Sequence, residues 1–194
     1  MAVSGIVSSL ALRLGGVYVA LVTFAVTAVH RAVAVLRGPA DIVVSAAGVY
    51  ALAPAAQVEE KDWALNQDIN LRAPFFIAQA AVAAKASDPS TGKRGIAIVN
   101  IASVGAYRSG TGDAALSYSA SKAGLVALTK SMAAEWAAQG VRVNVVSPGV
   151  IDTSMVRIMD NPEAGAAWLK ARVLVFALAG NATRPTAVSS VTNR

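Results

Sequence analysis

Three short apolar runs, separated by long stretches of helical spacing, constrain the fold of this chain more than any other feature. The runs are residues 41–45, 95–101 and 141–146, and the helical stretches cover 59–85 and 114–139. Short apolar strands that alternate with helices are typical of βαβ units in a mostly parallel sheet covered by helices. We therefore expect an α/β fold with a doubly wound sheet and helices on both faces.

The N-terminal region supplies one further predicted strand. Residues 17–23 are apolar and β-branched, and a helical pattern over 26–36 follows them. We expect 17–23 to lie beside 41–45, with 26–36 as a right-handed crossover. Without such a neighbour, the edge of 41–45 would be exposed and prone to aggregation. The predicted sheet is thus a reduced one of four strands.

The chain shows no internal repeat and no linker, so we expect a single domain over residues 1–194. Two short helices are predicted over 154–159 and 162–172. The two ends, 1–16 and 173–194, carry no defined pattern, and no element is predicted beyond Arg172.

Charge and composition narrow the classes of partner. The net charge is +6, from 17 basic and 11 acidic residues, but the basic residues are scattered and form no run. No nucleic-acid partner is therefore expected. The chain has no cysteine and one histidine, His30, so no metal site is expected.

Residues 14–29 carry no charge. Sixteen residues with two glycines are short of the roughly 20 that a spanning helix needs, so a buried strand is the favoured interpretation. A membrane signal or anchor in this stretch stays open as an alternative. We expect a cytoplasmic protein without a membrane partner.

The predicted strand ends point to a single crevice, because ligands of parallel α/β sheets bind beyond the carboxyl ends of the strands. The helix that contains Tyr118 and Lys122 begins near that edge. The two residues are four apart in the sequence, so they share one helix face. A lysine ammonium beside a phenol favours the phenolate, so we expect Lys122 to lower the Tyr118 pKa from about 10. Taken alone, such a pair can equally be a surface lysine on an amphipathic helix.

The motifs around this pair resemble those of the short-chain dehydrogenase/reductase family over Gly38–Leu169. They occur in order along the chain and are Asp41-Ile-Val-Val-Ser-Ala-Ala-Gly48, Trp63-Ala-Leu-Asn-Gln-Asp-Ile-Asn70, Ile98-Val-Asn100-Ile-Ala-Ser103, Tyr118-Ser-Ala-Ser-Lys122 and Val141-Arg-Val-Asn144-Val-Val-Ser-Pro148-Gly149-Val-Ile-Asp-Thr153. The resemblance implies a Rossmann-like domain, an NAD or NADP cofactor, a small carbonyl or secondary alcohol substrate and a homo-oligomer.

The resemblance also implies a role for individual residues. Tyr118 would be the general acid or base, Lys122 its partner and a ligand of the nicotinamide ribose, Ser103 the group that polarises the substrate carbonyl, and Asn70 the support of a proton-relay water. The implied cofactor-binding residues are Gly48, Ile101, Tyr118, Lys122, Pro148, Gly149, Ile151 and Thr153.

Pro74 gives a physical reason to single out Asn70. Proline lacks an N–H, so the carbonyl of Asn70, four residues earlier, loses its helical donor and the helix should kink there. The freed carbonyl would then accept a hydrogen bond from water. A simple kink without a catalytic role is the alternative for Asn70, and a local backbone bond is the alternative for the Ser103 hydroxyl.

The N-terminal part departs from the family pattern. The family's glycine-rich phosphate loop would fall at Phe24, Ala28 and His30, each of which carries a side chain where close approach is needed. About two βα units of the family pattern are also absent, and these units hold the acidic or basic residue that selects NAD or NADP. The sequence therefore does not indicate which of the two cofactors is preferred. Two alternatives to an active enzyme follow: a catalytically inactive or weakly binding remnant of the family, and a membrane-associated enzyme tethered by residues 14–29.

Overall fold

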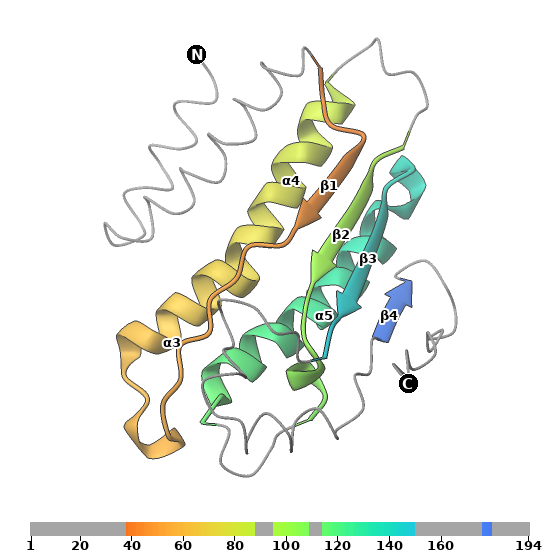
Figure 1. Cartoon of the computed structure of the whole chain (residues 1–194). Coiled ribbons are helices and arrows are strands. Elements are labelled where there is room, and N and C mark those ends of the chain that lie inside the picture. The colour runs from red at the N-terminus through yellow and green to blue at the C-terminus, as the bar shows by residue number, and fades with distance from the viewer. Residues whose placement is uncertain (1–37, 88–94, 109–113, 150–175, 180–194) are drawn as a thin grey trace, which may run out of the picture.

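The computed structural model describes residues 38–87, 95–108, 114–149 and 176–179, which form one sheet with helices packed on it (Figure 1). The sheet order is β1-β2-β3-β4, from β1 (Ile42–Ser45), β2 (Ala97–Ile101), β3 (Arg142–Ser147) and β4 (Phe176–Ala179). The first three strands pair in parallel and β4 is antiparallel to β3. The predicted mostly parallel sheet is confirmed, and its first three strands lie within two residues of their predicted ends.

The fourth strand of the described sheet differs from the predicted one. β4 lies in the C-terminal stretch for which the sequence predicted no element, and it adds to the β3 edge rather than to the β1 edge. The predicted strand 17–23 and the predicted helices 26–36, 154–159 and 162–172 lie outside the described residues.

The two long predicted helices are both present. The first is divided into α3 (Glu60–Gln67), the π-helical turn η2 (Asp68–Arg72) and α4 (Ala73–Ala86). The second is α5 (Leu116–Trp136), extended by the short η5 (Ala137–Gln139). Gly140 ends it with a φ of 75°, a left-handed conformation that glycine adopts without strain. Two further short turns are η1 (Ala55–Gln57) and η4 (Val104–Ala106).

The π-helical turn η2 directly precedes Pro74. The Ala73 N–H donates to the carbonyl of Asp68, five residues back rather than four. A π turn widens the helix by one residue, and such turns are one of the known ways in which a helix bends. The irregularity predicted at Asn70 is therefore present, as a local widening of an otherwise continuous helix.

Both long helices pack on one face of the sheet. Ile98 and Val143 are fully buried and belong to the same apolar cluster as Ala78 of α4 and Met132 of α5. Figure 1 shows α4 and α5 on the same side of the strands. Side chains alternate between the two faces of a sheet along a strand. Ile42 and Val44 of β1 therefore both point to the face opposite the two helices. Within the described residues they remain 67% and 57% exposed, and no described helix covers that face.

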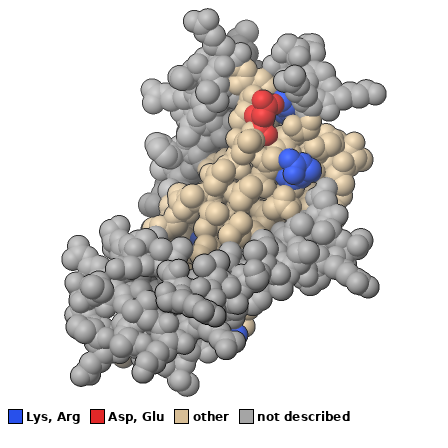
Figure 2. Space-filling view, turned by 45° about the vertical axis from the view of Figure 1, so that its right-hand side comes forward, with Lys and Arg blue, Asp and Glu red and all other residues tan. Residues whose placement is uncertain are grey.

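The described surface is poor in charge on the face that Figure 2 shows, where one acidic group lies directly beside a basic one and most of the area is uncharged. No continuous basic stripe crosses it. No helix in the described part of the chain is long and apolar enough to cross a bilayer. Residues 14–29 lie outside the described part of the chain, so the structure does not test the membrane alternative that rests on them.

Gly95 and Gly38 differ in how much space surrounds them. A Cβ on Gly95 would lie 2.0 Å from the carbonyl oxygen of Gly140, whereas a Cβ on Gly38 would meet nothing within 4 Å. We expect Gly95→Ala to lower the free energy of unfolding by about 2 kcal/mol or more, because backbone must move to admit the methyl group. Gly38→Ala is the matched control and should change it by less than about 1 kcal/mol. Equal urea midpoints for the two variants would contradict this packing.

Candidate active site

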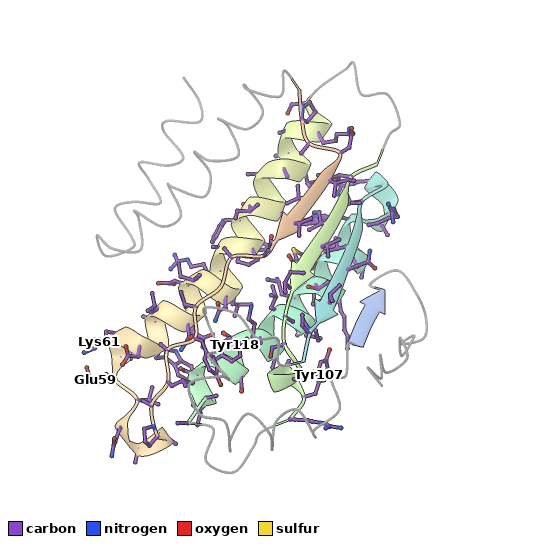
Figure 3. The ribbon with its side chains drawn as sticks, viewed as in Figure 1. Glu59, Lys61, Tyr107 and Tyr118 are labelled. Atoms are coloured by element: carbon purple, nitrogen blue, oxygen red, sulfur yellow. The ribbon has the colours of Figure 1, made fainter. Side chains whose placement is uncertain are left out.

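Three elements bring the four predicted catalytic side chains to one end of the sheet, where β1, β2 and β3 end. Tyr118 and Lys122 come from the first turns of α5, Ser103 follows β2, and Asn70 lies in η2. Figure 3 shows Tyr118 at this end, close to the loops that leave the strands. The exits of β2 and β3 are joined directly, because the Val104 N–H donates to the Pro148 carbonyl at 2.9 Å.

Lys122 is buried at the centre of this group, with 5% of its surface exposed. Its Nζ donates to the carbonyl oxygen of Ile101 at 2.8 Å and lies 5.8 Å from the centroid of the Tyr118 ring. A Cβ on Gly48 would lie 3.5 Å from the same Nζ, so the ammonium reaches across the exits of β1 and β2. Burial disfavours the charged form and lowers the pKa of Lys122 from 10.5 to about 8.

The pKa of Tyr118 is raised, which corrects the sequence-based expectation. Burial of the phenol is the main cause, because it disfavours the phenolate, and a hydrogen bond with Ser103 acts in the opposite direction. The expected effect of Lys122 does not dominate, since its ammonium bonds the Ile101 carbonyl rather than the phenol oxygen. At neutral pH Tyr118 is therefore a protonated phenol.

Ser103 makes the local backbone bond that was the alternative for its hydroxyl, while its role in polarising a substrate carbonyl stays a prediction. It caps η4, with its Oγ accepting the Gly105 N–H at 3.1 Å. A Cβ on Gly105 would lie 3.4 Å from that oxygen and 3.7 Å from a ring carbon of Tyr118, so serine and tyrosine flank the same glycine. The backbone bond uses an acceptor site of the hydroxyl and leaves its proton available to a second partner.

The Asn70 side chain turns to the backbone of the β1 exit. Its Oδ1 accepts the Val49 N–H at 2.9 Å and its Nδ2 donates to the Val49 carbonyl at 3.0 Å. Asn70 is fully buried, and its Nδ2 also lies 3.1 Å from Ser121 Oγ on α5. The carboxamide thus holds two elements together, while the water-binding role predicted for the Asn70 carbonyl stays a prediction.

Several residues of this region escaped the sequence analysis. Asn66 is also fully buried and bonds the Ala51 backbone with its carboxamide, in the way that Asn70 bonds Val49. Its Nδ2 lies 2.7 Å from Ser117 Oγ. A signal was available, since Asn66 and Asn70 stand four residues apart, as do Ser117 and Ser121 on either side of Tyr118.

The other predicted cofactor-binding residues fall into two groups. Gly48, Ile101, Pro148 and Gly149 lie at the three strand exits, beside the candidate catalytic side chains. Ile151 and Thr153 lie outside the described residues. Among the described residues, no three His, Cys, Asp or Glu side chains gather as a metal ion would require.

Comparison with known proteins assigns this arrangement to a family. A family model described as enoyl-(acyl carrier protein) reductase matches residues 22–191. D-threitol dehydrogenase of Mycolicibacterium smegmatis is 40% identical over 147 residues, which are 73% of this chain and 52% of that protein. The chain belongs to the short-chain dehydrogenase/reductase family of oxidoreductases.

Solved structures agree with this assignment and with a Rossmann-like fold. A 4-hydroxyisoleucine dehydrogenase complexed with NADH matches with a TM-score of 0.63 and 30% identity, over 71% of this chain and 55% of that one. A protein from Agrobacterium tumefaciens with bound NADP matches with a TM-score of 0.59 and 36% identity, over 67% of this chain and 51% of that one. Members of the family thus bind NAD or NADP, and this chain spans about half the length of the relatives that it matches.

The buried Lys122 should make the free energy of unfolding depend on pH. Because the Lys122 pKa is about 8 when folded and near 10.4 when unfolded, the unfolded chain binds more protons between these values. Stability should therefore rise with pH across this window, by about 3 kcal/mol relative to Lys122→Met. Urea unfolding at pH 7 to 10.5, in steps of about half a unit, measures this difference.

A matched control lies on the same helix. Lys130 is exposed, so Lys130→Met should leave the pH dependence of the parent protein unchanged. If parent and Lys122→Met keep a constant difference in unfolding free energy over the whole window, Lys122 is not buried as described.

Proposed function

We propose that the chain acts as an NAD(P)-dependent oxidoreductase that interconverts a carbonyl and a secondary alcohol, with Tyr118 as the general acid or base. One observation carries the proposal. A buried lysine, a half-buried tyrosine and a serine hydroxyl meet at the strand exits, where α/β folds bind their ligands. Family membership supports the reaction class, and the substrate itself stays open.

Each residue of the group has a distinct part in carbonyl reduction. The protonated Tyr118 phenol gives its proton to the substrate oxygen, and the Ser103 hydroxyl donates to the same oxygen and orients it. Lys122 donates one N–H to the Ile101 carbonyl, which leaves two N–H groups for the ribose of the nicotinamide. The nicotinamide, when bound, supplies the hydride. Because burial keeps Tyr118 protonated, the phenol is ready to act as the proton donor in carbonyl reduction.

The residues present suit the nicotinamide half of the cofactor. A Cβ on Gly48 would lie 3.3 Å from Asn70 Oδ1 and 3.5 Å from Lys122 Nζ, so the missing side chain leaves room beside both groups. Phe24, Ala28 and His30 stand where the family's glycine-rich phosphate loop would fall. A second candidate is therefore a family member without catalysis, because side chains at these positions oppose the close approach of the cofactor phosphates. A homo-oligomer and a small alcohol or ketone substrate remain further proposals.

Cofactor titration separates the two candidates. With NADH or NADPH at a hundred times the dissociation constant, a real site should stabilise the protein by about 2.7 kcal/mol, measured as a rise in melting temperature. The non-catalytic candidate predicts no rise with either cofactor over the same range. That result would remove the proposed enzyme function for this chain.

The catalytic role of the phenol needs its own test. Tyr118→Phe should lower turnover by about a hundredfold or more while cofactor binding stays within about twofold, because the ring remains and only the proton donor is lost. Tyr107→Phe makes the same change at a tyrosine of the described chain that is 46% exposed and follows η4, and serves as the control. Sugar alcohols and their ketoses are suitable first substrates, given the D-threitol dehydrogenase relative. Full turnover in Tyr118→Phe would exclude this mechanism.

A further inference from the structure

The segment that follows β1 is anchored at three alternate residues. Val49 bonds the Asn70 carboxamide through both its N–H and its carbonyl, and Ala51 bonds the Asn66 carboxamide in the same way. Ala53 follows, with its N–H donating to the Ala114 carbonyl at 3.0 Å. A carboxamide that pairs with both polar groups of one residue replaces a neighbouring strand, so the segment is fixed although it belongs to no sheet.

The same two carboxamides connect the segment to the helix that carries Tyr118. Asn66 Nδ2 lies 2.7 Å from Ser117 Oγ and Asn70 Nδ2 lies 3.1 Å from Ser121 Oγ. Ser121 Oγ in turn donates to the carbonyl of Tyr118 at 2.6 Å. Both asparagines are fully buried, so breaking any of these bonds leaves a polar group without water to replace its partner. We call Asn66 and Asn70, with their backbone and serine partners, the asparagine clamp.

Tyr50 is the residue between the two clamped positions. Its ring meets the Tyr118 ring edge to face, with centroids 4.5 Å apart and planes at 82°. Edge-to-face ring pairs attract each other beyond the area that they bury, so the contact restrains the orientation of both rings. The Tyr50 backbone cannot shift without releasing Val49 or Ala51 from the clamp.

We propose that Tyr50 is a positioning residue whose ring, held by the asparagine clamp, sets the orientation of the Tyr118 phenol and keeps water from it. Its catalytic consequence rests on the function proposed above for Tyr118. Asn66 acts through Tyr50, by fixing Ala51. The Tyr50 ring lies against the Tyr118 ring, and burial is the main cause of the raised pKa of Tyr118.

The test compares two replacements of Tyr50 in the full chain. Tyr50→Phe keeps the ring and Tyr50→Ala removes it, and neither adds a phenol that would titrate. The ultraviolet absorbance of the phenolate is followed against pH, and Tyr118→Phe in each background identifies the Tyr118 transition. We expect the Tyr118 pKa to be at least about half a unit lower in Tyr50→Ala than in Tyr50→Phe, because water reaches the phenolate. Equal values would overturn the proposal.

A double-mutant cycle tests the part played by Asn66. Asn66→Ala should lower the Tyr118 pKa in the same direction, and should add little in the Tyr50→Ala background, because both changes remove the same restraint. Gln67→Ala is the matched control: it deletes a bond of 3.1 Å to the Ser117 carbonyl from the next residue of α3, without touching the clamped segment. Fully additive effects of Asn66→Ala and Tyr50→Ala would overturn the link between them.

The titration needs no cofactor or substrate, so it can fail or succeed independently of the proposed function. Far-ultraviolet circular dichroism at each pH shows that the chain stays folded. Where Tyr50→Ala does not fold, Tyr50→Leu, which fills space without a ring, takes its place with the same expected direction. In an active protein, the alkaline limb of carbonyl reduction should move to lower pH in Tyr50→Ala by the shift that the titration measures.

Discussion

The need to satisfy buried polar side chains governs how α3, η2 and α5 meet. Asn66, Asn70, Ser117 and Ser121 are all buried, and each has a hydrogen-bond partner on a neighbouring element. An unsatisfied buried carboxamide costs about 1–3 kcal/mol, so the two helices can pack in few registers other than the observed one. That register sets the direction of the helix face between the serines, from which Tyr118 projects. Apolar packing alone would tolerate small rotations that this network does not.

The strongest sequence patterns predicted the strands and the site in outline. The apolar runs at β1, β2 and β3 gave their positions because strands buried under helices leave an unbroken hydrophobic signal. The four-residue spacing of Tyr118 and Lys122 placed them on one helix face, because residues at this spacing lie on the same side of an α-helix. Both signals are local, so one sequence suffices to read them.

What the sequence could not supply depends on distance and burial. The direction of the Tyr118 pKa turned on where the Lys122 ammonium points, which spacing leaves open. Asn66 resembled any polar residue on an amphipathic helix until the chain folded and buried it completely. β4 is a four-residue strand whose pairing depends on β3, so its own residues carry little signal.

The π-helical turn η2 also sets the rotation of the clamp relative to the core. A π turn is in effect one residue added to an α-helix, placed here between the residues that α3 and α4 each present to their neighbours. If all the residues of 68–72 were wound as a regular α-helix, the added residue would rotate α3 by about 100° against α4. Asn66 would then leave Ala51 and Ser117 while the core side of α4 stayed in place. The widened turn therefore sets the rotation of α3, which carries Asn66 of the clamp, relative to α4, which packs in the core.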